Sequence, residues 1–148
     1  MNRQTIDLKR SAIMRAVKSK DTGPELQVRR FVHCLGYRFR LHRKDLPGSP
    51  DLVLPRLRSA ILVHGCFWHG HQCSRGARRP KKNAAYWRNK ITGNVQRDVR
   101  NMQKLLSLGW KTLVVWECEL RSKPEDTQRK IAAFLNRATK LSGRTLKN

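Results

Sequence analysis

Two apolar runs most constrain the fold of the chain. SAILVHG (59–65) and WKTLVVWE (110–117) are typical of buried strands. Between them, apolar residues recur every three or four positions and predict a long helix that Gly109 ends. These residues are Trp87, Ile91, Val95, Val99, Met102 and Leu106. Two strands joined by a helix of about 20 residues must cross over in parallel, so the pattern predicts an α/β sheet with helices on its faces.

Helix-capping signatures predict two further helices. Thr22-Gly23-Pro24-Glu25 combines a capping box with a proline in the first turn, and Gly36 is placed to end the helix. Its apolar side would contain Leu26, Phe31, Cys34 and Leu35, with Cys34 as a small buried hydrophobe. Ser122-Lys123-Pro124-Glu125 repeats the signature and predicts a last helix.

Two short strands are expected between the first helix and residue 59. Alternation of apolar and basic residues over 37–42 predicts a half-buried strand with His42 on the surface. DLVLP (51–55), after the turn at 46–50, predicts the second strand. Trp110 and Trp116, at the ends of the last strand, are expected to belong to the core only.

The charge of the chain predicts its partner. Thirty-three Lys and Arg face ten Asp and Glu, a formal net charge of +23. A protein this basic repels itself unless it works beside a polyanion. We expect that polyanion to be nucleic acid, and we favour this interpretation over a ribosome-associated protein. No apolar window approaches the roughly 18 residues of a membrane span, and residues 1–20 lack the apolar core of a secretory signal. We therefore expect a cytoplasmic protein that acts on DNA and not on membranes.

The length of 148 residues fits one domain with a real core and is too short for two. Residues 1–20 are basic, with Ile13, Met14 and Val17 at helical spacing, and predict a short helix or an arm that orders on DNA. The segment 141–148 is expected to be a frayed tail.

The run HGCFWHGHQC (64–73) predicts a metal site. Cysteines without an export signal are more often metal ligands than disulfide partners. Cys66 and Cys73, with one histidine of this run and with Cys118 just beyond the last strand, would complete a closed tetrahedral zinc site. The spacing does not choose between His69 and His71, and the alternative is two incidental thiols near solvent-exposed histidines.

The histidine that does not bind this metal would be held rigidly and suited to proton transfer. His64, at the end of its strand, is a second candidate. Asp51 follows Pro50 at the start of the neighbouring strand, so Asp51 and His64 could face each other across the two strands.

Five segments resemble the bacterial very-short-patch repair (Vsr) endonucleases. They are MRAVKSKDTGPE (14–25), PGSPDLVL (47–54), ILVHGCFWHGHQC (61–73), YWRNKITGNVQRD (86–98) and GWKTLVVWEC (109–118). The resemblance implies a restriction-endonuclease-like fold, a mixed central sheet flanked by helices, with a PD-(D/E)xK site pattern. Pro50-Asp51 supplies the PD, and Leu62-Val63-His64 stands where other members have E-x-K, a departure that the Vsr family shares.

The resemblance also implies roles for these residues. Asp51 and the backbone carbonyl of Val63 would bind a catalytic Mg²⁺. The family carries threonine at the position of Val63, so any role of that hydroxyl is lost here. His69 would be the general base, His64 would support the scissile phosphate or the leaving group, and Glu25 would contact water bound to the metal. These roles suit phosphodiester hydrolysis, which needs an activated water, a Lewis acid and a positioned base.

The family's structural zinc would be held by Cys66, His71, Cys73 and Cys118. Phe67, Trp68 and Trp87 would wedge between base pairs, with Tyr86 as the alternative to Trp87. The family uses such wedges to find T:G mispairs and nicks the strand 5′ to the thymine. The resemblance further implies a monomer that works with mismatch-repair proteins, although no residue identifies those partners.

Two other functions remain open at this point. One is a nicking nuclease of the same fold with a different DNA specificity, linked to restriction. The other is a zinc-stabilised DNA-binding module without catalytic activity. Asp51 with His64 and His69 argues against the second, because binding alone needs no such cluster.

Overall fold

The structure, a computed structural model, describes residues 21–143. The expected N-terminal arm (1–20) and residues 144–148 of the expected tail lie outside this part. One mixed sheet contains the strands β1 (Arg40–Leu41), β2 (Leu52–Leu54), β3 (Ser59–His64) and β4 (Lys111–Trp116), in the spatial order β1-β2-β3-β4. The first two pairings are antiparallel, and β3 pairs with β4 in parallel. The predicted crossover is therefore confirmed.

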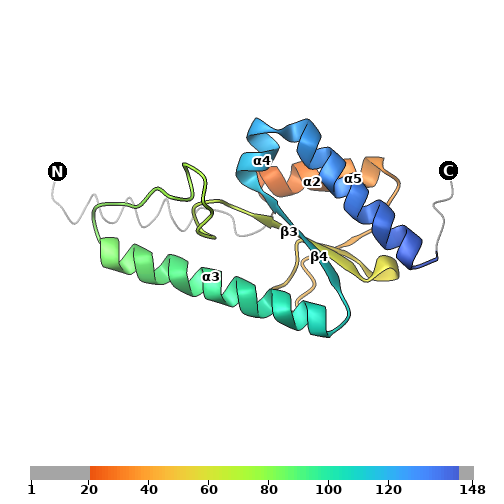
Figure 1. The fold of residues 1–148 in the computed structure, drawn as a ribbon, viewed down its shortest axis with the longest axis horizontal. Coiled ribbons are helices and arrows are strands. Elements are labelled where there is room, and N and C mark those ends of the chain that lie inside the picture. Colours follow the sequence, from red (N-terminus) through yellow and green to blue (C-terminus); the bar gives the residue numbers. More distant parts are fainter. Residues whose placement is uncertain (1–20, 144–148) are drawn as a thin grey trace.

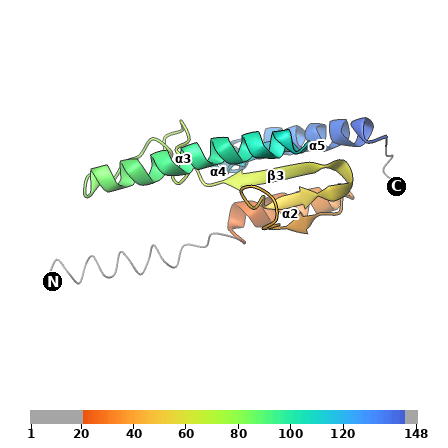
Figure 2. The same cartoon turned by 90° about the horizontal axis from the view of Figure 1, so that it is seen from below.

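Helices cover both faces of the sheet (Figure 1). They are α2 (Gly23–Cys34), α3 (Ala84–Ser107), α4 (Glu117–Ser122) and α5 (Pro124–Leu141), and a 3₁₀ turn, η1 (Pro55–Leu57), joins β2 to β3. Leu52 and Leu54 pack on one face in the main core, which contains residues of α2 and α5, whereas Val53 packs on the other face against Leu105 of α3. Figure 2 shows β3 between α3 and α2.

Helix α2 begins as predicted but buries a different face. The Thr22 hydroxyl caps it by accepting a hydrogen bond from the Glu25 N–H at 3.4 Å. Val28 and Val32 are fully buried, whereas Cys34 is exposed, so the prediction of a buried Cys34 was wrong. Two residues on a helix turn the side chain by about 200°, which carries Cys34 away from the face that holds Val32.

Helix α3 forms as predicted, but most of its apolar stripe is not buried. Ile91 and Leu105 are buried, whereas Val99 is 52% and Leu106 is 66% exposed. The 24 residues of α3 extend over about 36 Å, while the six of β4 extend over about 20 Å. Helix α3 therefore extends beyond the end of the sheet, as Figure 1 shows. In addition, β4 is the edge strand, and few of the described residues pack on the part of the apolar stripe that lies past it.

Local patterns missed α4, which directly follows β4. The strand expected over 37–42 shortens to β1, although the Tyr37 side chain is buried and its hydroxyl lies 3.2 Å from Thr139 Oγ1 of α5. Helix α5 ends at Leu141, so the first residue of the expected tail belongs to a helix. Among residues 21–143, no helix has the length and apolar character needed to cross a membrane.

Adjacent leucines on α3 test this packing. Leu105→Ala should lower the free energy of unfolding by about 2–5 kcal/mol, because Leu105 is fully buried. Leu106→Ala removes the same atoms from a side chain that is 66% exposed and should change stability by less than about 0.5 kcal/mol. Urea denaturation of both variants measures the difference, and equal losses would contradict the orientation of α3.

Candidate active site and metal centre

The parallel pairing of β3 with β4 brings the site residues to one edge of the sheet. His64, the last residue of β3, is in register with Trp116, the last residue of β4. Cys66 follows β3 by two positions, and Cys118 follows β4 by two. The Cys118 N–H consequently lies 3.4 Å from Cys66 Sγ, although 52 positions separate the two residues in sequence.

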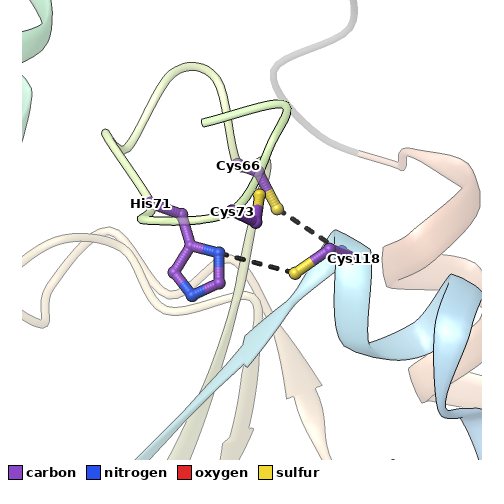
Figure 3. Close-up of side chains that lie close together, drawn as sticks. All are labelled: Cys66, His71, Cys73 and Cys118. Carbon is purple, nitrogen blue, oxygen red and sulfur yellow. Dashed lines mark hydrogen bonds between the residues drawn. The ribbon is translucent and has the colours of Figure 1, made fainter. Parts of the chain in front are cut away.

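Four ligand-type side chains meet at this edge. One donor atom from each of Cys66, His71, Cys73 and Cys118 lies within 4.8 Å of the others. Figure 3 shows them converging from the loop after β3 and from the first turn of α4, with Cys118 Sγ 3.4 Å from His71 Nδ1. Three sulfur atoms and one imidazole nitrogen form a donor set typical of tetrahedral zinc. His71, and not His69, lies in this cluster.

Two thiols of the cluster, those of Cys66 and Cys73, differ in pKa. Burial raises the pKa of Cys66 to about 12. The Gly76 N–H, 3.3 Å from Cys73 Sγ, lowers the pKa of Cys73 to about 6. Since a metal takes the thiolate form, its binding would release the proton of Cys66, and affinity would fall in acid.

The loop that carries these ligands is tightly folded without a strand or helix of its own between β3 and α3. A Cβ atom on Gly76 would lie 1.8 Å from the carbonyl oxygen of His71. Gly70 has a φ of +62°, and a Cβ there would lie 2.9 Å from Val95 of α3. Both positions therefore require glycine, and the close packing leaves little freedom around His71.

A second group of side chains surrounds a cavity of about 330 Å³ at the same edge. Asp51, just before β2, accepts a hydrogen bond from the Val63 N–H of β3 at 2.7 Å. The residues that line the cavity include His42, Lys44, Ser49, Asp51, Val63, His64, His69, Asp98 and Asn101. Asp51 and the histidines singled out in the sequence, His64 and His69, thus line one cavity.

Asp51 and Glu25 form a pair of interacting carboxyl groups. Burial, and then the neighbouring Glu25 carboxyl, raise the pKa of Asp51 to about 7. Burial also acts to raise the pKa of Glu25, but hydrogen bonds to Asp51 and His42 and the nearby positive charge lower it overall. A cation bound at Asp51 would favour the ionised form of Asp51 and lower its pKa.

His64 and His69 stack face to face, with ring centroids 3.8 Å apart and planes 4° from parallel. Their nitrogens lie near Asp98 in a group that could bind a metal, but two parallel rings cannot both direct a lone pair at one ion. Burial, and then the charge of His69, lower the pKa of His64 to about 4. His64 is accordingly neutral at pH 7.

Asp98 is a site residue that the sequence analysis missed. Its Oδ2 lies 2.6 Å from His69 Nδ1, so the α3 carboxylate fixes the orientation of the His69 ring. Asn94, one turn earlier, donates a hydrogen bond to the Trp68 carbonyl at 3.0 Å and ties the helix to the loop. The available signal was an acidic residue between apolar positions in a chain with only ten acidic residues.

His42 and Arg29 were also missed. His42 was expected to be a surface residue, but its Nε2 lies 2.7 Å from Glu25 Oε1 and 3.9 Å from Asp51 Oδ1, so that prediction was wrong. Arg29, one helical turn after Glu25, donates to Glu25 Oε2. The spacing of four residues on α2 was the only local signal for this ion pair.

Trp116 was expected to belong to the core only, and this too was wrong. Its ring stacks on His71 at 4.1 Å between centroids and presents an edge to His64 at 5.2 Å. Trp116 therefore lies between the cysteine cluster and the stacked histidines. It also lines an apolar groove of about 460 Å³, with Val95, Val99 and Leu106 of α3.

The aromatics of the loop gather with those at the start of α3. Phe67, Trp68 and Trp87 lie within 5.2–5.8 Å of one another, between ring centroids, and all three are partly exposed. Tyr86 is 57% exposed and contacts Trp87 at 5.2 Å. Phe67 and Trp68 thus form one aromatic surface with Trp87, and Tyr86 extends it.

Sequence comparisons point to one family. The sequence model of the family described as DNA mismatch endonuclease Vsr matches residues 5–75. The type II nicking enzyme V.XorIIP of Xanthomonas oryzae is 53% identical over 76% of this chain and 82% of its own length. The nicking enzyme V.NmeAIP of Neisseria meningitidis is 45% identical over 78% and 81%, and the DNA mismatch endonuclease Vsr of Escherichia coli is 41% identical over 80% and 75%.

The chain belongs to the Vsr endonuclease family. As a Vsr-family protein it is a DNA endonuclease, which confirms the resemblance seen in the motifs and the enzyme class that they imply. The alternative of a DNA-binding module without catalytic activity is set aside.

Two glycines of this Vsr-family chain test the packing of the ligand loop. Gly76→Ala should lower the free energy of unfolding by about 1–3 kcal/mol, because the new methyl group meets the backbone of His71. Gly93→Ala is the matched control within α3, where no atom lies within 4 Å of an added Cβ, and should stabilise the protein by about 0.5–1 kcal/mol. Denaturant titration compares them, and a Gly76→Ala protein as stable as wild type would contradict the loop geometry.

Proposed function

We propose that this protein is a Mg²⁺-dependent endonuclease that nicks one DNA strand 5′ to the mispaired thymine of a T:G mismatch, in very-short-patch repair. The observation that carries the proposal is the single cavity lined by Asp51, His64 and His69, with Asp98 holding the His69 ring at 2.6 Å. A carboxylate that can bind the metal and an oriented imidazole are groups that metal-assisted hydrolysis of a phosphodiester uses.

Asp51 and the backbone carbonyl of Val63 would hold the magnesium ion. Asp51 fits this role because burial and the neighbouring Glu25 carboxyl raise its pKa to about 7, so that a bound cation would stabilise the ionised carboxylate. When bound, Mg²⁺ neutralises charge on the phosphoryl oxygens and lowers the pKa of its water. The hydroxyl that the family's threonine provides is absent at Val63, which leaves the carbonyl as the only ligand atom of this residue.

His69 would act as the general base. Its Nδ1 is engaged by Asp98, so Nε2 is the nitrogen available to take a proton from the attacking water. His64, neutral at pH 7, would donate a hydrogen bond to the scissile phosphate or the leaving oxygen. Glu25, which is 2% exposed and interacts with Asp51, would orient water on the metal.

The aromatic surface would find the mismatch. Phe67, Trp68 and Trp87 are partly exposed on neighbouring segments and would enter the base stack, where unstacking costs less at a mispair. Zn²⁺ on Cys66, His71, Cys73 and Cys118 would hold the loop that carries the first two. The net charge of +23 would supply sequence-independent affinity for the phosphates.

The setting follows from the same proposal. The protein would act as a monomer on double-stranded DNA in the cytoplasm, with mismatch-repair proteins as partners. The second candidate is a nicking enzyme with a different DNA specificity, linked to restriction. The names of the relatives that are 53% and 45% identical, type II nicking enzymes, favour that candidate.

Cleavage of end-labelled duplexes tests the proposal. With Mg²⁺, a duplex carrying T:G should be nicked 5′ to the thymine, while the matched T:A duplex stays intact. Asp51→Asn should lower the rate by roughly a thousandfold or more, since a metal's charge stabilisation is worth several kcal/mol, and should leave mismatch binding largely unchanged.

The outcomes separate the candidates. Equal nicking of matched and mispaired duplexes in one particular flanking sequence would support the restriction-linked enzyme. An Asp51→Asn protein with the wild-type rate would remove Asp51 from the mechanism, whichever duplex is cut.

A further inference from the structure

We propose that His42 is a positioning residue of the magnesium site, which holds the Glu25 carboxylate where it can orient metal-bound water beside Asp51. The inference rests on the proposed function, in which Asp51 binds the catalytic metal and Glu25 orients its water. His42 itself is assigned no contact with the metal.

The backbone fixes the place of His42. Its N–H donates to the Asp51 carbonyl at 3.3 Å and so extends the antiparallel pairing of β1 with β2 by one residue. The His42 side chain is 21% exposed and lines the cavity together with Asp51 and Val63. The ring is therefore held at the carboxylates by the sheet itself.

The hydrogen bonds of Glu25 show what the ring does there. One carboxylate oxygen, Oε2, accepts from the Asp21 N–H at 2.9 Å and from Arg29. The other, Oε1, is 2.7 Å from His42 Nε2. Since a carboxylate only accepts, Nε2 is the donor, and it also faces Asp51 Oδ1 at 3.9 Å. His42 thus bonds Oε1, whereas Asp21 and Arg29 bond Oε2.

Loss of the ring would remove this donor from the Glu25 carboxylate in a site with little solvent, because Glu25 is 2% exposed. The carboxylate could then rotate about the Oε2 contacts, and water on a cation at Asp51 would lose a fixed acceptor. Outer partners that orient metal ligands typically change metal affinity by about 10- to 100-fold. We expect a shift of that size in the Mg²⁺ concentration that gives half-maximal nicking.

Three variants of the full chain test the proposal. His42→Ala should raise the half-saturating Mg²⁺ concentration about 10- to 100-fold, with a smaller effect on the rate at saturating Mg²⁺. In His42→Gln the amide nitrogen can replace Nε2 as the donor, so the half-saturating Mg²⁺ concentration should return to within a few fold of the wild-type value. Arg43→Ala, one position along and paired with Asp45, is the matched control and should keep the wild-type value.

A readout without catalysis completes the test. Electron paramagnetic resonance of Mn²⁺ added to the DNA-free protein should show weaker binding in His42→Ala than in His42→Gln and wild type. The imidazole ¹⁵N signal of His42 in the wild-type protein should shift on Mg²⁺ addition, and this arm does not depend on whether a variant folds.

The results have distinct meanings. Equal half-saturating Mg²⁺ concentrations and equal Mn²⁺ binding in His42→Ala and wild type would overturn the inference. It would also be overturned if His42→Ala and His42→Gln lost metal affinity equally and both had a lowered Tm, because the ring would then have only a structural role. A wild-type protein that binds Mn²⁺ through His42-dependent contacts and yet nicks no DNA would instead contradict the proposed function.

Discussion

The parallel, in-register pairing of β3 with β4 is the interaction on which the site depends. It ends both strands at the same sheet edge, so His64 lies beside Trp116, and Cys66 lies beside Cys118. A slip of one residue would move every side chain of a strand to the opposite face and separate these pairs. Helix α3 provides the crossover that makes this pairing parallel and places Asp98 against His69. Fold and site are thus consequences of one strand register.

The cysteine cluster compensates for a loop that lacks a core of its own. The loop after β3 carries Phe67 and Trp68 of the aromatic surface, and also His69, yet it contains no helix or strand. Cross-linking it to the first turn of α4 by a metal would fix all three side chains at once. Trp116 contacts both groups of side chains: its ring stacks on His71 of the cysteine cluster at 4.1 Å and is in edge contact with His64 of the stacked histidines at 5.2 Å. Removal of a metal bound at this cluster would therefore disturb the stacked histidines.

Local sequence patterns predicted those features that depend on neighbouring residues. The cap at Thr22, the long helix and the two buried strands follow from periodicity and turn chemistry, and the clustered cysteines indicated a metal site. His42, Asp98 and Trp116 could not be placed in this way, because their roles depend on partners that are distant in sequence. A pattern of period 3.6 shows that a helix has an apolar stripe but not how much of it the sheet covers. The exposed part of the α3 stripe could for that reason not be foreseen.

We infer that a metal centre built from the ends of β3 and β4 holds the histidines proposed to be catalytic, His64 and His69, in place without binding them. X-ray absorption at the zinc edge of the purified protein tests this inference. We expect a zinc ion with three sulfur ligands at about 2.3 Å and one nitrogen at about 2.0–2.1 Å. A protein without zinc, or a zinc bound only by nitrogen and oxygen, would contradict it, because the metal would then be absent from this cluster or would occupy the histidines assigned to catalysis.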